Sequence, residues 1–407
     1  MFKMISQGHI FSPEDKGVQD ILICQEKIAK IGKDLSNLGN QLGAKVIHAD
    51  GKIVAPGFID QHVHFLGAGD YEGPGRATTD IRFGSLIRSG ITTAVGCLGS
   101  EDTARNLLDL VKRARDLDKL GITTYIYTGS FNIPPPTITG NVRHDLMMVD
   151  KVLGVKFTIS ENMAPLVSLS ELADVARNSY LGGRIAGKKG LIHIHLGTRS
   201  ERMGPLFELI KLIGSRGQAT GPVPAGEPPP GIPITNFIPT HVNRVDPDIM
   251  EHAIKFLKMG GTVDMSAIMS PDLGSHTSIS PEQALSEFVK LKIPIEQVTL
   301  SSDGNVPIPK IDSQGNKIGL CYAGVDVLYR AFLSIVRAGH IPFFDALKVV
   351  TCNVARVLGI EDRKGAIEVG KDADLIIFSK DYNISNVLAR GQVLLENGRM
   401  VIQNYLE

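Results

Sequence analysis

From residue 57 onward, short apolar runs alternate with longer segments whose apolar residues recur at the spacing of an amphipathic helix. Eight of these runs have the length of buried strands: Gly57–Val63, Ile91–Cys97, Ile122–Thr128, Gly154–Ile159, Leu191–His195, Phe237–His241, Thr262–Ser266 and Val298–Ser302. Helical patterns lie between several of them, at Asp102–Leu120, Leu169–Leu181, Asp248–Met259 and Pro281–Leu291. Ser280-Pro281 suits a helix start, and Gly260-Gly261 suits a helix end. The alternation predicts an α/β protein with a (β/α)8 TIM barrel at residues 57–361.

An open, doubly wound sheet would give a similar alternation of strands and helices. That fold commonly binds dinucleotides through a G-x-G-x-x-G turn after its first strand. No such pattern follows an early strand of this chain. The closed barrel is therefore the preferred prediction.

The two ends of the chain have a different pattern. Short strand-like runs occur at Asp20–Cys24, Lys27–Ile31, Asp374–Phe378 and Gln392–Leu395, with turn residues such as Gly32 and Gly398 nearby. Neither end is long enough to bury a core alone. We expect residues 1–56 and 362–407 to form one small β-sandwich domain beside the barrel.

The segment Gly214–Pro233, between the fifth and sixth predicted strands, is rich in proline and glycine. Such a composition predicts a loop rather than regular structure. On a barrel, a loop of this length can act as an active-site lid, and it can equally be a passive surface excursion. Both interpretations stay open.

Composition excludes several classes of function. The chain has 407 residues, 43% of them apolar, and its 43 basic and 43 acidic residues give a formal net charge of zero, so no charge pattern favours nucleic acid or an anionic membrane. No stretch approaches the roughly 20 apolar residues of a membrane span, and the first residues lack the apolar core of a signal peptide. None of the four cysteines forms a C-x-x-C pair. We expect a cytoplasmic protein with reduced thiols.

Candidate chemistry gathers at the carboxyl ends of the predicted strands. The first strand ends in His62-Val63-His64, whose two imidazoles would lie on one face about 7 Å apart. Taken alone, such a pair is as compatible with hydrogen-bonded core histidines as with metal ligands. Four further ionisable residues lie in or at the ends of later strands: Lys156, His195, His241 and Asp303. A barrel would bring all six to one mouth, where active sites of this fold form.

Lys156 lies within a strand, between Val155 and Phe157. A buried lysine at this position needs a partner for its charge or the loss of that charge, because burying an unpaired ammonium group costs free energy. Carbamylation by carbon dioxide would remove this positive charge by converting the amine into an anionic oxygen ligand that can bridge two cations.

These residues resemble the amidohydrolase superfamily and, more narrowly, the isoaspartyl (β-aspartyl) dipeptidases. The resemblance spans nearly the whole chain. It rests on the motifs Pro56–His64, Thr137–Gly140, Val152–Lys156, Pro239–Arg244, Leu300–Asn305 and Gly370–Leu375.

The resemblance implies a binuclear zinc site. His62, His64 and Asp303 would hold one ion, His195 and His241 the other, and carbamylated Lys156 would bridge the two together with a hydroxide. Asp303 would be the catalytic acid–base. His193 is interpreted as a core or supporting histidine. The substrate would be contacted by Arg244, Gly69, Tyr71, Glu72, Ser100 and Phe131.

Several pocket residues depart from the family pattern. Phe131 stands where the family has an oxyanion-donating tyrosine, and Met163 stands where it has a second carboxylate-binding arginine. Tyr71 occupies the position of the family's amine-recognising glutamate, with Glu72 adjacent, and Pro307 replaces a serine. The metal motifs are intact, so these changes affect the expected substrate more than the expected chemistry.

We therefore expect a metal-dependent amide-bond hydrolase with a small-molecule substrate, foremost a β-aspartyl dipeptide, and a homo-oligomeric state. One alternative is an enzyme that hydrolyses another amide, such as a cyclic amide or imide or an N-acyl amino acid. The other is a non-catalytic barrel, whose usual sign is the loss of metal ligands.

Overall fold

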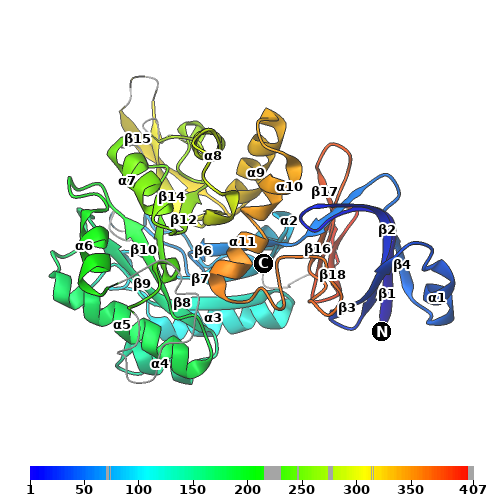
Figure 1. Cartoon of the computed structure of the whole chain (residues 1–407), viewed down its shortest axis with the longest axis horizontal. Helices are drawn as coiled ribbons and strands as arrows, with labels where there is room; N and C mark the ends of the chain where they lie inside the picture. Colours follow the sequence, from blue (N-terminus) through cyan, green and yellow to red (C-terminus); the bar gives the residue numbers. More distant parts are fainter. Residues whose placement is uncertain are drawn as a thin grey trace.

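Eight parallel strands form the centre of the molecule, seen in a computed structural model (Figure 1) that describes residues 1–69, 73, 75–214, 231–244, 247–273, 278–312, 314 and 316–401. Neighbours in the sequence are neighbours in the sheet. The strands are β6 (Phe58–Val63), β7 (Ile91–Gly96), β8 (Thr123–Gly129), β9 (Val152–Ile159), β10 (Leu191–Leu196), β11 (Phe237–Thr240), β12 (Val263–Ser266) and β13 (Val298–Ser301). The first and last meet through a parallel bridge between Val63 and Gly304, so the predicted barrel is confirmed.

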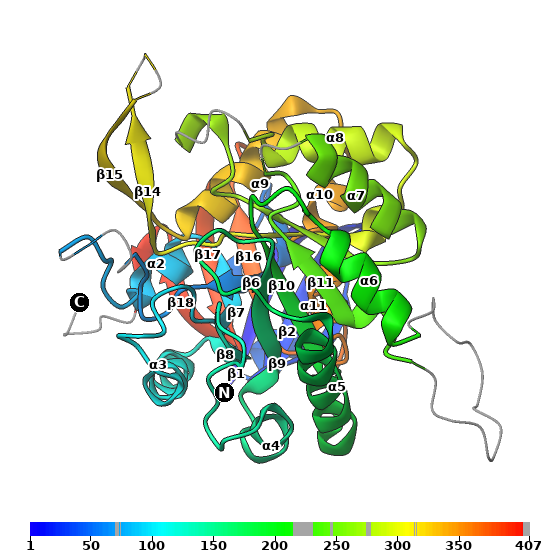
Figure 2. The same ribbon diagram turned by 90° about the vertical axis from the view of Figure 1, so that its left-hand side faces the viewer.

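Helices surround this sheet, as Figure 2 shows in a view turned by 90°. They are α2 (Phe83–Arg88), α3 (Leu107–Leu120), α4 (Val142–Met148), α5 (Leu169–Ala186), α6 (Gly204–Leu212), α7 (Pro247–Lys258), α8 (Pro281–Lys290), α9 (Asp326–Ala338), α10 (Phe343–Lys348) and α11 (Cys352–Leu358). Short 3-10 turns lie at Ile234–Asn236, Pro271–Leu273 and Ile295–Gln297. None of the helices described has the length and apolar character needed to cross a membrane.

The helix boundaries follow from local capping chemistry. The Ser280 hydroxyl accepts a hydrogen bond from the Gln283 amide at 3.2 Å, and Gln283 reciprocates, which forms the capping box of α8. The chain leaves α7 through Gly260, whose φ of +89° suits glycine. The first predicted helix begins at Leu107 rather than Asp102, because the Asn106 side chain caps it by accepting from the Asp109 amide.

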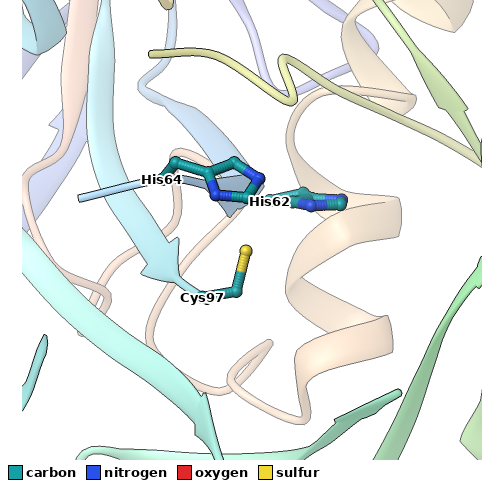
Figure 3. A group of neighbouring side chains, drawn as sticks. All are labelled: His62, His64 and Cys97. Carbon is teal, nitrogen blue, oxygen red and sulfur yellow. The ribbon is translucent and has the colours of Figure 1, made fainter. Parts of the chain in front are cut away.

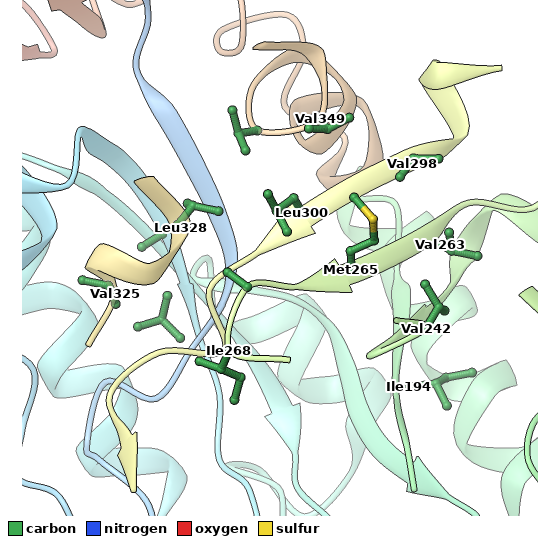
Figure 4. Close-up of a cluster of buried hydrophobic side chains, with 14 of the residues drawn as sticks. Ile194, Val242, Val263, Met265, Ile268, Val298, Leu300, Val325, Leu328 and Val349 are labelled. Carbon is green, nitrogen blue, oxygen red and sulfur yellow. The ribbon is translucent and has the colours of Figure 1, made fainter. Parts of the chain in front are cut away.

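Alternation along β12 and β13 separates apolar side chains that face the helices from polar side chains that point the other way. In Figure 4, Val298 and Leu300 of β13 and Val263 and Met265 of β12 belong to one buried apolar cluster that also contains Leu328 of α9 and Val349. The alternate residues point the other way: Asp264 accepts hydrogen bonds from Thr299 at 2.8 Å and Ser301 at 2.6 Å. A period of two therefore anchors the helices on one face and orders polar groups on the other.

Strands from both ends of the chain build a second, nine-stranded sheet (Figure 1, right). Its members are β1 (Phe2–Phe11), β2 (Asp15–Cys24), β3 (Lys27–Gly32), β4 (Lys45–His48), β5 (Ile53–Pro56), β16 (Leu375–Phe378), β17 (Ile384–Ala389), β18 (Gln392–Glu396) and β19 (Arg399–Met400), with α1 (Ser36–Gln41) beside β1. A shared core joins the ends, for example Ile5 and Ile21 with Leu375 and Leu388. This is the small β domain expected from the two termini, and we propose residues 1–56 with 362–407 as its extent.

Two strand features escaped the sequence analysis. The strand β1 is interrupted between Ile5 and Gly8, where Gln7 adopts a φ of +55°, so its apolar alternation is broken. The hairpin of β14 (Val306–Ile311) and β15 (Lys317–Ala323) projects from the barrel (Figure 2). Pro307 and Pro309 made a strand at β14 unexpected from the sequence, because proline cannot donate a backbone hydrogen bond to a neighbouring strand. Both strands of a two-stranded hairpin have an outer edge, and proline is tolerated there.

Candidate metal centre

The six residues proposed as metal ligands meet at the carboxyl ends of the barrel strands. His62 lies in β6 and His64 directly after it, Lys156 lies in β9, His195 lies in β10, His241 follows β11, and Asp303 follows β13 by two residues. All six are buried. Parallel strands bring their carboxyl ends to one mouth of the barrel, so residues distant in the sequence become neighbours.

The first group is centred on Asp303. Its Oδ1 atom lies 3.2 Å from His62 Nε2 and 3.3 Å from His64 Nε2. His62, His241 and Asp303 also offer three ligand atoms within 4.8 Å of one another. Imidazole nitrogens and a carboxylate are common ligands of zinc and related divalent ions.

The second group consists of His195 and His241. The Nδ1 atom of His195 lies 2.8 Å from the Nε2 atom of His241. The two groups adjoin, because the rings of His62 and His241 lie 5.4 Å apart between centroids.

Lys156 lies beside the first group and is fully buried. Its Nζ atom is 2.9 Å from His62 Nε2 and 3.1 Å from Cys97 Sγ, and neither partner is a carboxylate. The centroid of the Phe131 ring lies 5.7 Å from the same Nζ atom.

Each histidine directs one ring nitrogen to the centre and the other to a supporting group. The outward contacts are His62 Nδ1 with His193 Nε2 at 3.1 Å, His64 Nδ1 with Glu101 Oε1 at 3.2 Å, His195 Nε2 with Glu161 Oε2 at 3.1 Å, and His241 Nδ1 with Ser266 Oγ at 2.6 Å. Metal-binding histidines in proteins are held in this way, because the outer hydrogen bond fixes the ring and its tautomer. These side chains therefore have the chemistry and the supporting contacts of metal ligands.

Burial and charge set the protonation of the imidazoles. Burial lowers the pKa of His195 to about 4 and holds the pKa values of His62 and His241 well below the ordinary range. These three rings are thus neutral, the form that binds metal. Burial also opposes the charging of His64, but its electrostatic interactions with Cys97 and Glu101 prevail and raise its pKa to about 10. The environment that holds a proton on His64 would equally favour a divalent cation.

Two of the candidate ligands have unusual backbone conformations. His241 has a φ of +69° and Asp303 a φ of +52°, in the left-handed region that non-glycine residues seldom adopt. Such conformations are held by the surrounding structure and gather at functional sites. Here they turn both side chains inward just beyond the strand ends.

The structure places four of the six proposed substrate-contact residues. Phe131 packs on His195 with 4.5 Å between ring centroids, and the Nη1 atom of Arg244 lies 3.6 Å from Glu161 Oε2. Gly69 has a φ of +111°, and a Cβ atom there would lie 2.3 Å from the Pro307 ring. Ser100 follows the end of β7 and is partly buried. Tyr71, Glu72 and most of the proline-rich loop, residues 215–230, lie outside the described residues.

The sequence analysis missed three groups beside the ligands: Cys97, Glu101 and Glu161. Each lies at or just beyond the end of its strand, β7 or β9. Extending the search at the carboxyl ends to cysteines, and to a few residues past each strand, would have found them.

Comparison with known proteins agrees with the barrel and its histidine-rich mouth. The chain belongs to the amidohydrolase family, whose model matches residues 53–394. It is a member of a class of hydrolases, and the non-catalytic alternative finds no support in this match.

Among solved structures, the chain resembles the β-aspartyl dipeptidase of Fervidobacterium islandicum AW-1 in complex with the β-Asp-Leu dipeptide, with 32% identity, all of both chains covered and a TM-score of 0.85. The dihydropyrimidinase of Brevibacillus agri NCHU1002 shares the fold at 19% identity, covering 98% of this chain and 96% of that one, with a TM-score of 0.66. A curated relative, the dihydroorotase of Lactobacillus johnsonii, is 24% identical over 94% of this chain and 90% of its own length.

Proposed function

We propose that this amidohydrolase is a β-aspartyl dipeptidase that binds two divalent metal ions, with zinc the leading candidate. The observation that carries the proposal is the convergence of four histidines, Asp303 and Lys156, with every histidine held from behind by a second group. His62, His64 and Asp303 would hold one ion, and His195 and His241 the other. Carbamylated Lys156 would bridge them.

When bound, such a pair of ions lowers the pKa of a water molecule and polarises the scissile carbonyl. The protein's own acid–base group is Asp303, whose Oδ1 atom lies between His62 and His64. Its carboxylate would accept the proton of the attacking water and then deliver it to the departing amine.

Arg244 supplies substrate recognition in this proposal. The Arg244 side chain is 20% exposed. Its Nη1 atom lies 3.6 Å from Glu161 and donates a hydrogen bond to the Leu196 carbonyl at 2.7 Å. A planar guanidinium group held in this way can bind a substrate carboxylate through two parallel hydrogen bonds. The similarity to the dipeptidase structure that contains β-Asp-Leu favours an isoaspartyl peptide as the source of that carboxylate.

The test is hydrolysis of β-Asp-Leu by purified protein whose bound metals are quantified. We expect about two metal equivalents per chain, loss of turnover with a chelator, and recovery on adding zinc. Asp303→Asn should abolish turnover, whereas Asp326→Asn, a change at an exposed residue of α9, should not. Absence of turnover across a panel of isoaspartyl dipeptides would overturn the substrate assignment.

A second candidate is hydrolysis of a cyclic amide or imide. Met163, which stands where the resemblance places a second arginine, is 51% exposed and offers no counter-charge, so a substrate with one carboxylate fewer would fit this side of the pocket better. The likeness to a dihydroorotase and a dihydropyrimidinase points the same way. Faster turnover of dihydroorotate or a hydantoin than of β-Asp-Leu would favour this candidate.

A further inference from the structure

Cys97 lies inside the proposed metal centre and has no part in the ligand set assigned above. It directly follows β7, at the carboxyl end of the second barrel strand, and is 1% exposed. Figure 3 shows its sulfur pointing toward the imidazoles of His62 and His64. The ligand atoms of these three residues lie within 4.8 Å of one another.

The distances suit a shared ion. Zinc binds thiolate sulfur at about 2.3 Å and imidazole nitrogen at about 2.0–2.1 Å, so two such ligands on one tetrahedral ion lie roughly 3.5 Å apart. The three ligand atoms, all within 4.8 Å of one another, are close to this separation. The three residues come from two adjacent strands, which hold the geometry firmly.

Cys97 also belongs to a buried apolar cluster that includes Val95 and Tyr127, and its sulfur has two polar neighbours. The thiol faces the Val63 carbonyl at 3.7 Å, a weak contact, and the Lys156 Nζ atom at 3.1 Å. A small apolar residue would fill the same space without placing sulfur beside an amine and two imidazoles. Thiolate sulfur is, by contrast, a preferred ligand of zinc and cobalt and a poor one for magnesium or manganese.

We propose that Cys97 supplies a thiolate ligand to the metal ion held by His62 and His64. The inference rests on the proposed function, because it requires that ion. It adds a soft anionic ligand to a site otherwise built from nitrogen and oxygen. The centre would therefore prefer zinc or cobalt to manganese more strongly than a site without the sulfur.

The test is the absorption spectrum of the cobalt(II)-loaded protein. A cysteine bound to cobalt gives an intense sulfur-to-metal charge-transfer band in the near ultraviolet, separate from the weak visible bands of the ion. We expect this band in the wild type, its loss in Cys97→Ser, and its retention in the matched control Cys352→Ser. The preference for zinc over manganese, measured by competition, should fall by about tenfold or more in Cys97→Ser.

A variant that keeps Cys97 makes the test independent of how Cys97→Ser folds. The chain has four cysteines, so replacing Cys24, Cys321 and Cys352 with serine leaves Cys97 alone. The charge-transfer band must persist in that triple variant. Visible cobalt bands without the charge-transfer band would overturn the thiolate ligand while leaving the proposed hydrolase intact. Failure of the wild type to bind cobalt or zinc at all would overturn both.

Discussion

The Nδ1 atom of His195 and the Nε2 atom of His241 lie 2.8 Å apart, although 46 residues separate them in the chain. Each ring is oriented from behind, His195 by Glu161 and His241 by Ser266. Two neutral imidazoles can share a hydrogen bond at this distance, because each ring has one donor and one acceptor nitrogen. In the proposed metal centre, a cation would take the place of the shared proton and both nitrogens would bind it.

We predict that His195→Ala and His241→Ala each remove one metal equivalent per chain. The double variant should also retain about one equivalent, because either single change already empties the same position and the two effects do not add. Inductively coupled plasma analysis of dialysed protein measures this. His340→Ala, at an exposed histidine, is the control and should keep both ions. Loss of two equivalents in the double variant but none in the singles would contradict the shared position.

Lys156→Met should separate activity from stability. Methionine has nearly the same length and needs no compensation for a buried charge, so the metal-free variant should melt at the same temperature as the wild type or higher. Turnover should fall more than about 100-fold. Even mutation of a group that only supports a metal ligand typically lowers metal affinity or activity by about 10–100-fold. Calorimetry and a dipeptide assay measure the two effects, with the exposed Lys112→Met as control.

A bridging role for Lys156 has a further consequence. In Lys156→Ala, short-chain carboxylic acids should partly restore turnover, because a free carboxylate can occupy the place of the carbamate. Activity like that of the wild type in this variant, without added acid, would exclude the bridge.

Phe131→Tyr should raise turnover of β-Asp-Leu. Phe131 packs against His195 at 4.5 Å between centroids, so a phenolic oxygen there would lie near the reacting carbonyl. One oxyanion donor is worth about 10²–10³ in turnover, which sets the largest expected gain. Steady-state kinetics measure it, and Phe207→Tyr on α6 is the matched control. An unchanged rate would show that another group already donates to the oxyanion.

Asp372 should stabilise the junction of the two sheets in a pH-dependent way. Its buried carboxylate lies 2.8 Å from Lys364 Nζ, 2.6 Å from Lys27 Nζ and 2.9 Å from Arg363 Nη2. Burial opposes ionisation, but the charge of Lys364 and then the other two cations prevail and lower the pKa of Asp372 to about 2 from an ordinary 3.8. The ionised form is thus favoured in the folded state.

Folding lowers the pKa of Asp372. Its contribution to the free energy of unfolding is therefore complete above about pH 4 and is lost as the pH falls toward 2. We predict that Asp372→Asn costs about 2 kcal/mol of unfolding free energy at pH 7. The difference from the wild type should shrink between pH 4 and pH 2. Urea unfolding of metal-free protein at several pH values measures it, with the exposed Asp174→Asn as control. A difference that stays constant over this range would refute the assignment.

Much of the architecture could be predicted from the sequence. Short runs of mostly apolar and β-branched residues, such as Ile91–Cys97, predict buried parallel strands, because both faces of each strand are covered. Ser280 and Gly260 mark helix ends through local backbone chemistry. The interrupted strand β1 and the hairpin of β14 and β15 could not be found in this way, since a bulge and two prolines break the local pattern.

By itself, the sequence determined the order of the barrel strands, and it predicted six residues in or just beyond them as metal ligands. Only the tertiary structure decided which other side chains contact these residues. It placed Cys97 beside Lys156, Glu101 beside His64, and Glu161 beside His195. The physical reason is that the candidate ligands lie in or just after successive strands, and the succession of strands can be read from the sequence. Contacts between strands depend on register and on the closure of the barrel, which no local pattern encodes.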